Sequence, residues 1–172
     1  MKPLLWKFVK HSDLLFSDAI RIAELKEQHW PYGIDSQLCW IKNNITCDDV
    51  HLIGEDTNGS ISAYLTLVMV DVEYDRHEEK MIGIGGVCVD KSLEHKGYGK
   101  ILIFNANEYI RRSGKKGILL CKEPLREFYY KCDWNSLSLS DVCVAGIKYE
   151  HLVLTYPKII EAKCMLLISR NF

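Results

Sequence analysis

The sequence predicts an α/β fold in which helices lie on the faces of a mixed β-sheet. Segments with strand-like patterns alternate with segments of helical periodicity along the 172 residues. Asn58-Gly59 separates two strand patterns, which is a strong hairpin signal. A glycine-rich strand pattern over Met81–Val89 leads through a polar turn into an amphipathic helix. Together these three observations favour a sheet with helices packed against it.

The first part of the chain predicts a strand and then a helix. We expect a strand over Leu4–Val9 and a helix over Asp13–Gln28, where apolar residues recur at helical spacing. Ser12 or Asp13 is expected to cap this helix. His29–Gly33 is expected to form a loop, because a proline and a glycine interrupt the pattern there.

The next segment predicts a helix and two strands. We expect a short helix over Ser36–Asn44, a strand over His51–Glu55 and, after the turn, a long strand over Ser60–Val72. Glu73–Lys80 is rich in charge and is expected to connect this strand to the one over Met81–Val89. Glycine inside the latter strand weakens its packing unless another group approaches the backbone closely.

The second half of the chain repeats the alternation. We expect a helix over Gly97–Arg112 that stops at Gly114, a strand over Ile118–Cys121, and a helix that begins at Pro124 and runs to about Lys131. Further strands are expected over Val142–Ile147, His151–Tyr156 and Cys164–Ile168. Since no linker, repeat or low-complexity segment interrupts the pattern, we expect one domain over residues 1–172.

Composition excludes some function classes. The formal net charge of -1 gives no general attraction to nucleic acid or to an anionic membrane. The N-terminal segment is not expected to act as a signal peptide, and no stretch is apolar for long enough to span a bilayer. Seven scattered cysteines without a C-x-x-C pair indicate reduced, mostly buried thiols, a cytoplasmic location and no metal site.

The turn before the helix at Gly97 carries the clearest functional signal. The first N–H groups of a helix have no partner inside it, and its N-terminus is partly positive, so this position suits phosphate. Gly97 and Gly99 remove side chains where a ligand approaches the backbone, and Lys96 and Lys100 add positive charge. Asp90 is expected to shape the turn after its strand.

Two motifs in this part of the chain resemble those of the GNAT-type N-acetyltransferase superfamily. The strand end Val87-Cys88-Val89 and the pair Gly97-Tyr98-Gly99 match V-x-V followed by R/Q-x-x-G-x-G/A. The segment from Leu125 to Trp134 is similar to the family's A-x-x-x-Y-x-x-x-G-F, with Tyr129 on the tyrosine. The layout resembles the aminoglycoside 2′-N-acetyltransferase subgroup as well.

The sequence departs from the family pattern at several positions. Glu94 stands where Arg or Gln is usual, so we expect its side chain to point to solvent. Lys122 replaces a frequent Asn, and Asp133-Trp134 replaces Gly-Phe. A common extra glycine of the family falls on His95.

The resemblance implies a mostly antiparallel central sheet with helices on both faces and an acetyl-CoA site. The pantetheine arm would pair with the strand like an added strand, and the turn would hold the pyrophosphate. The cofactor-binding residues that it implies are Val87, Cys88, Val89, His95, Lys96, Gly97, Tyr98, Gly99 and Lys100. A backbone N–H near Val89 would face the thioester oxygen.

The resemblance also assigns a catalytic group. Tyr129 is the candidate general acid that protonates the leaving thiolate, because a phenol keeps its proton at neutral pH. The alternative is a core tyrosine that packs its ring. Tyr130 would face away on the helix and serves as the natural control. A covalent acetyl-cysteine route through Cys88 is a further alternative, although the sequence shows no partner base.

The acceptor site is expected to include Trp30, Tyr32 and Glu73. The candidates for its aromatic lining are His29, Trp30, Tyr32 and Trp40, whose rings suit a cation or an amphipathic amine, although Trp30 and Trp40 could instead seal the core. The general base stays open among carboxylates and a histidine of one charged segment: Asp71, Glu73, His77, Glu78 and Glu79.

Two functions therefore compete. The first is transfer of an acetyl group from acetyl-CoA directly to a primary amine of a small molecule or peptide. The second is a non-catalytic acyl-CoA-binding module of the same fold, which Glu94 and Lys122 keep open. A homodimer is a further alternative, since the segment from Ile159 to Phe172 would either complete the sheet or pair with another subunit.

Overall fold

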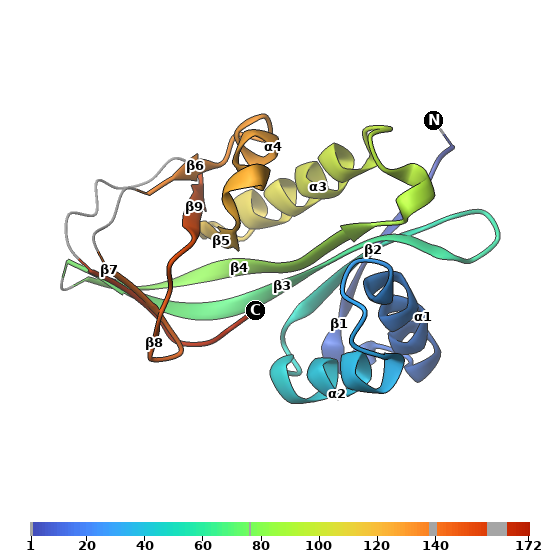
Figure 1. Cartoon of the computed structure of the whole chain (residues 1–172), viewed down its shortest axis with the longest axis horizontal. Coiled ribbons are helices and arrows are strands. Elements are labelled where there is room, and N and C mark those ends of the chain that lie inside the picture. The colour runs from blue at the N-terminus through green and yellow to red at the C-terminus, as the bar shows by residue number, and fades with distance from the viewer. Residues whose placement is uncertain (1, 76, 138–140, 158–164) are drawn as a thin grey trace. The chain divides into compact units, whose positions relative to one another are not determined.

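The computed structural model describes residues 2–75, 77–137, 141–157 and 165–172, which form two compact units (Figure 1). The first unit comprises Met1–Val68, Gly85–Ala106 and Phe172, and the second comprises Met69–Ile84 and Asn107–Asn171. Three elements contribute residues to both units: strands β3 (Ile61–Tyr74) and β4 (His77–Val89) and helix α3 (Tyr98–Arg112).

The first unit is built on an antiparallel arrangement of strands. β1 (Leu5–Lys10) pairs with β2 (Val50–Glu55), and β2 pairs with β3. The expected hairpin between β2 and β3 is confirmed. Its turn places Gly59 at φ +82°, a left-handed conformation that glycine adopts without strain.

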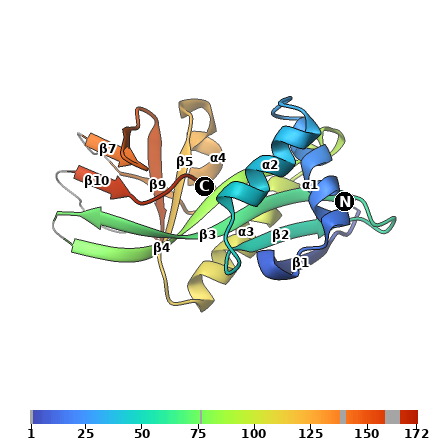
Figure 2. The ribbon, with the colours of Figure 1, turned by 90° about the horizontal axis from the view of Figure 1, so that it is seen from below.

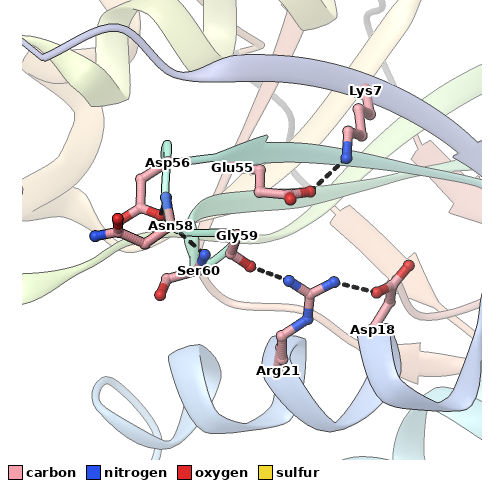
Figure 3. A network of polar contacts seen from close by, with 8 residues as sticks. All are labelled: Lys7, Asp18, Arg21, Glu55, Asp56, Asn58, Gly59 and Ser60. Carbon is pink, nitrogen blue, oxygen red and sulfur yellow. Dashed lines mark hydrogen bonds and ion pairs between the residues drawn. The ribbon is translucent and has the colours of Figure 1, made fainter.

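Polar contacts hold this hairpin turn from two sides (Figure 3). The Asp56 carboxylate accepts hydrogen bonds from the main-chain N–H groups of Asn58 and Ser60. Arg21, from a helix beside the turn, donates to the Gly59 carbonyl and to the Asp18 carboxylate. Lys7 and Glu55 form an ion pair across β1 and β2. The turn is therefore tied to the first helix as well as to its own strands.

Two helices follow β1 and precede β2. α1 spans Phe16–Glu27 and α2 spans Ile34–Asn44. Within the first unit both lie on one face of the strands, and the beginning of α3 lies on the other face (Figures 1 and 2). No described helix is long and apolar enough to cross a membrane.

The expected cap of α1 was wrong. The helix begins at Phe16, and its N-cap is Leu15, whose side chain cannot accept a hydrogen bond. Ser12 and Asp13 instead belong to a 3-10 turn over His11–Asp13, where the Ser12 hydroxyl donates to the Asp13 carboxylate. α2 begins two residues before the expected Ser36, immediately after Gly33 at φ +87°.

The core of the first unit contains a chain of polar rings. Nδ1 of His11 lies 3.0 Å from Nε2 of His51, and Nδ1 of His51 lies 2.8 Å from the Tyr64 hydroxyl. His51 is fully buried. Its burial, with smaller effects from His11 and Lys26 that outweigh the opposing effect of Asp49, lowers the pKa of His51 to about 4.

The second unit contains a sheet with the strand order β6-β9-β5-β4-β3-β10-β7-β8. The strands not yet given are β5 (Gly117–Cys121), β6 (Asn135–Ser136), β7 (Asp141–Val144), β8 (Ile147–Lys148), β9 (Leu152–Tyr156) and β10 (Met165–Ile168). β4 pairs with β5 in parallel and β10 with β7 in parallel. The pairs β5–β9, β6–β9, β10–β3 and β7–β8 are antiparallel. The predicted mixed, mostly antiparallel sheet is thereby confirmed.

The expected connection over Glu73–Lys80 was mostly wrong, because β3 continues to Tyr74 and β4 begins at His77. At the end of β3 buried and exposed residues alternate, with Val70, Val72 and Tyr74 buried. The charged residues between them face solvent, which is the ordinary pattern of a half-exposed strand. β10 pairs with this end of β3, with Leu166 opposite Tyr74.

The expected strand over Val142–Ile147 is in fact a tight hairpin of β7 and β8. Ala145 and Gly146 form the turn at φ +50° and +77°. Positive φ at both positions is typical of a two-residue turn whose twist matches the flanking strands. The expected last strand agrees with β10 over its described residues, and its Cys164 lies outside the described residues.

Helix α4 (Arg126–Tyr130) follows a 3-10 turn over Glu123–Leu125. The expected helix from Pro124 to Lys131 therefore exists with a tighter first turn. In the second unit Tyr129 of α4 is buried and Tyr130 is exposed, as expected. Among the described cysteines, Cys88, Cys121 and Cys132 are buried, Cys143 is half-buried, and Cys39 and Cys47 are exposed, all as free thiols.

The buried imidazole of His51 predicts an acid-sensitive stability. An unfolded chain binds a proton at the ordinary pKa of 6.5, whereas the folded chain binds it only near 4. The contribution of His51 to the free energy of unfolding should therefore be fully present above pH 6.5. It should fall by roughly 3 kcal/mol as the pH decreases from 6.5 to 4. Denaturant unfolding across that range measures the loss.

His51→Gln provides the control, because it should lack this segment of the pH dependence. The neighbouring groups that face His51 are His11, Asp49, Lys26 and Tyr64. Direct titration of the His51 ring by NMR separates its proton from theirs. An imidazole that titrates near 6.5 in the folded protein would contradict this account.

Candidate functional site

The turn that follows β4 is shaped by Asp90. Its carboxylate accepts hydrogen bonds from the N–H and hydroxyl of Ser92, at 2.9 and 2.5 Å. These bonds to Ser92, followed by the bond from Gln28, hold the pKa of Asp90 below its ordinary value. The role expected for Asp90 is therefore confirmed. It fixes the 3-10 turn over Lys91–Leu93 that leads to the glycines.

The chain then passes through two left-handed residues before α3 begins. His95 has φ +59° and Gly97 has φ +89°. A glycine at position 95 would take this conformation without the strain that a Cβ atom causes, which explains why glycine suits this turn. α3 begins at Tyr98, so its first N–H groups have no carbonyl one helical turn before them. Two main-chain N–H groups of the turn already have acceptors outside the helix: Lys96 donates to the Leu93 carbonyl at 3.4 Å, and Lys100 donates to the Gly97 carbonyl at 3.1 Å.

The side chains around these amides have distinct positions. Tyr98 is buried, and its hydroxyl donates to the Lys2 carbonyl at 2.9 Å, which anchors the start of α3. Lys96 is exposed, and its ammonium donates to the Ser92 carbonyl at 2.6 Å. Lys100 is exposed. Positive charge therefore lies around a helix N-terminus, an arrangement suited to phosphate.

Glu94 is exposed, in agreement with the expectation that it points to solvent. One of its carboxylate oxygens lies 3.8 Å from Nδ1 of His29. The negative charge is thus turned toward the end of α1.

Two residues at the end of α1 clamp this turn. The Gln28 amide donates to the Asp90 carboxylate, and its oxygen accepts from the Lys91 N–H, both at 3.0 Å. Nε2 of His29 lies 2.7 Å from the Val89 carbonyl. His29, a candidate for the acceptor lining by sequence, therefore contacts the end of β4 directly. We define Gln28 and His29 as the α1 clamp.

The strand segment before the turn departs from extended geometry at Gly86, a feature that we call the bulge of β4. Gly86 has φ +60°, and the ring of Tyr64 lies against it. Val87 is half-buried and Val89 is buried. Cys88 is buried, and burial raises the pKa of its thiol to about 12. A thiol that keeps its proton is a poor nucleophile, so the acetyl-cysteine alternative loses its chemical basis.

A cleft of about 460 Å³ lies in the first unit beside this strand. Its described lining consists of Lys26, Trp30, Tyr32, Ser36, Gln37, Trp40, Gly86 and Phe172. The aromatic residues expected at the acceptor site therefore share one cleft, together with the bulge of β4. The main chain of Phe172 lies against Gly85, where a Cβ atom would meet it at 2.3 Å. The cleft opens next to the residues expected to hold the cofactor.

Glu73 lines a different cleft, of about 490 Å³, in the second unit. Glu73 therefore lines a cleft of its own unit, and its expected grouping with Trp30 and Tyr32 stays a prediction. Of the other candidate bases, Asp71 pairs with Lys80 at 2.6 Å. Burial tends to raise the pKa of Glu79, but hydrogen bonds from Lys116 and Tyr74 outweigh it, and the pKa is lowered.

Tyr129 lies in the second unit, on α4. Burial raises the pKa of its phenol well above the ordinary value, with smaller contributions from Cys121 and Cys132. The phenol therefore stays protonated over the physiological range, as a proton donor must. The Tyr130 hydroxyl lies 2.5 Å from the Ser136 hydroxyl and is exposed.

The segment after Tyr129 is fixed to α3 by one buried side chain. The Asn107 amide donates to the Cys132 carbonyl and accepts from the indole N–H of Trp134, both at 2.9 Å. Trp134 is buried and lies against Gly117 of β5, where a Cβ atom would meet its ring at 2.8 Å. Trp134 thus fills space at the end of α4.

Sequence reasoning missed Lys26, the α1 clamp and Asn107. Lys26 follows Ala19, Ile22 and Ala23 at helical spacing, so the periodicity does place it on the buried face. Its positive charge, however, is ordinarily a sign of solvent exposure, so the periodicity alone does not single it out. The clamp and Asn107 act over 25 or more positions along the chain, and no local pattern marks such contacts.

Solved structures share this fold. Escherichia coli ElaA is 19% identical, covers 88% of this chain and 98% of its own, and superposes with a TM-score of 0.65. The E. coli GNAT family N-acetyltransferase YhbS, solved in complex with CoA, is 14% identical and superposes with a TM-score of 0.69. The match covers 97% of this chain and 90% of that one. An aminoglycoside 6′-N-acetyltransferase complexed with coenzyme A is 12% identical and superposes with a TM-score of 0.64. The match covers 87% of this chain and 95% of that one. The fold is therefore that of acyl-CoA N-acyltransferases.

The sequence places the chain within that class. A sequence model of the acetyltransferase (GNAT) family matches residues 17–134. The chain belongs to the GNAT acetyltransferase family. A comparison with curated proteins finds no match.

The role of Asn107 leads to a stability prediction. Asn107→Ala should remove the hydrogen bonds that Asn107 makes with the Cys132 carbonyl and the Trp134 indole N–H, which costs roughly 1–3 kcal/mol because a buried donor loses its acceptor. Asn105→Ala is the matched control, because Asn105 is half-buried and donates only to Ile101 of its own helix. Urea unfolding of both variants measures the difference. Equal losses would show that the Asn107 contacts carry no particular weight.

Proposed function

We propose that this protein transfers an acetyl group from acetyl-CoA to a primary amine by direct attack in a ternary complex, within one domain over residues 1–172. The family and fold support an acyl-CoA N-acetyltransferase in general. The observation that carries the proposal is the turn at the start of α3, where left-handed residues at 95 and 97 present a helix N-terminus beside two lysines.

In this proposal the pyrophosphate of acetyl-CoA binds those main-chain N–H groups of the turn from His95 to Lys100 that do not already donate to the Leu93 and Gly97 carbonyls, and the side chains of Lys96 and Lys100 contribute positive charge. The pantetheine arm lies along Val87–Val89. The Val89 carbonyl already accepts from His29, whereas the proposed contact to the thioester oxygen uses a donor, so the two do not compete. The cleft at Gly86 receives the acceptor.

The reaction balances as follows. The neutral amine attacks the thioester carbonyl carbon, a C–N bond forms, and the C–S bond breaks. The amine nitrogen gives its proton to solvent, Tyr129 protonates the leaving thiolate, and Tyr129 regains a proton from solvent, so that an amide and a thiol result. No metal takes part in this scheme. The cytoplasmic location and the homodimer both stay predictions; β10 completes the sheet of the second unit, and residues 159–164 lie outside the described residues.

Coenzyme A binding tests the cofactor part of the proposal. Calorimetric titration should show binding, and Lys100→Ala should weaken it by about fivefold at low salt, with a smaller effect at high salt because exposed charges are screened. Lys148→Ala, an exposed lysine of β8, is the control. Absence of heat, thermal shift and protection of the amides at 95–100 would overturn the proposal.

Turnover tests the catalytic part. Thiol release from acetyl-CoA with a panel of amines should fall about 10²-fold in Tyr129→Phe, the loss typical of a removed general acid. Tyr130→Phe should keep a near-normal rate, since its hydroxyl is exposed and contacts Ser136. Thermal unfolding of both variants shows whether the loss arises from instability.

The second candidate function is an acyl-CoA-binding module without turnover. The observation that favours it is the carboxylate of Glu94 in the turn, where the family usually has a positive or neutral side chain. Binding of acetyl-CoA without thiol release on any amine would decide for this alternative.

A further inference from the structure

Lys26 is a buried cation without an anion. It belongs to the inner face of α1 and is 6% exposed. Within the described part of the chain its ammonium makes no ion pair or hydrogen bond, and it lies over the face of Trp40, 4.4 Å from the ring centroid. A buried charge normally has a partner of opposite sign, because its desolvation is costly.

The ammonium reaches the cleft in the first unit. Lys26 is part of the cleft lining, beside Trp40 and Gln37. In the described residues, Thr155 Oγ1 is the sole fully enclosed side-chain polar atom that lacks a hydrogen bond. Nζ of Lys26 also lacks a hydrogen bond but is not fully enclosed, so it keeps some accessible surface. Because Lys26 lines the cleft, we take this surface to face the cleft.

The lining supplies no negative charge to this ammonium. Its described residues other than Lys26 are aromatic, small or neutral polar, and none is a carboxylate side chain. The Gln37 amide is already used, since it donates to the Trp30 carbonyl at 2.7 Å. The side chains of the cleft thus combine one positive charge, the aromatic residues Trp30, Tyr32, Trp40 and Phe172, and no carboxylate.

We propose that Lys26 binds the carboxylate of the acceptor, so that the amine acetylated in this cleft belongs to a small amino acid with an aromatic or apolar side chain. This inference rests on the proposed acetyl transfer at the same cleft. A carboxylate supplies the counter-charge that the ammonium lacks, and the rings of Trp30, Tyr32 and Trp40 offer an apolar surface to the side chain.

The same geometry disfavours a polycationic acceptor. The aromatic rings alone suit a cation, as the sequence indicates. In the structure, however, the face of Trp40 is occupied by the protein's own ammonium. An aminoglycoside or polyamine would bring like charge to it without a carboxylate to compensate.

The alternative role for Lys26 is that of a general base. Desolvation lowers its pKa, and a neutral amine can take a proton from the acceptor. The two roles predict different effects. If Lys26 binds a carboxylate, its loss weakens the binding of ligands that carry a carboxylate. If Lys26 is the base, its loss slows turnover of every amine. A pair of ligands that differ only in the carboxylate separates them.

The binding experiment uses the reaction product, so it needs no turnover. N-acetyl-L-phenylalanine and N-acetyl-L-phenylalaninamide are titrated into the coenzyme A-loaded protein, followed by tryptophan fluorescence. The carboxylate should bind at least about tenfold more tightly than the amide. Lys26→Met should abolish that difference, and Lys26→Arg should keep part of it. Lys42→Met, an exposed lysine of α2, should leave it unchanged.

The turnover experiment compares L-phenylalanine, L-phenylalaninamide and phenethylamine. Wild type should favour the amino acid in kcat/KM by about tenfold, and Lys26→Met should lose this preference through KM while its affinity for coenzyme A stays normal. Equal affinity of wild type for the two products would overturn the inference. Equal loss of kcat with all three amines in Lys26→Met, with a shifted pH profile, would assign the base role instead.

The outcomes also separate this inference from the proposed function. Failure to bind coenzyme A overturns the proposed function. Normal coenzyme A binding with no preference for a carboxylate overturns only the role of Lys26. Thermal unfolding reports on folding, and Lys26→Met should be at least as stable as wild type because it removes a buried charge.

Discussion

The α1 clamp is the contact on which the candidate site of the first unit depends. Gln28 and His29 use side-chain hydrogen bonds to join the end of α1 to the end of β4 and the turn after it. On one side of the clamp the chain enters the aromatic loop, and on the other it enters the turn before α3. Both functional segments therefore take their positions from the same two side chains.

His51 and Lys26 represent two ways to bury a titratable group in one core. His51 has a polar neighbour at each ring nitrogen, and its burial favours the neutral form. Lys26 has an aromatic face and a cleft, but no anion among the described residues. The first arrangement is complete without a ligand, whereas the second gains from one. This contrast is why the cleft, rather than the polar chain of the core, points to recognition.

Much of the fold could be predicted because its signals are local. The hairpin at Asn58-Gly59, the turn at Asp90 and the opposite exposure of Tyr129 and Tyr130 all follow from residues close in sequence. The end of β3 could not, since alternating charges indicate a solvated loop until β10 supplies a partner nearly a hundred residues later. Hydrogen bonds between distant residues, such as that of Asn107 to Trp134, have no local signal at all.

The candidate site was predictable to a similar extent. The left-handed turn and the helix start follow from glycine spacing. Trp30, Tyr32 and Trp40 were expected as an aromatic lining, and the three residues do line one cleft. The grouping of Glu73 with these rings was an inference from strand position, and the structure places it in another cleft. Lys26 was the main omission. Its position on the helix predicts burial, whereas its charge predicts exposure to solvent.

The bulge at Gly86 has an evolutionary consequence. It brings bare main chain to the cleft wall, so the shape of that wall comes from α1, α2 and the loop between them. Substitutions in those helices can remodel the cleft without altering the strand that follows the bulge. Under the proposed function, a lineage that carries this chain can thus acquire a new acceptor through substitutions in α1, α2 and their loop, while the residues proposed to hold the cofactor stay unchanged.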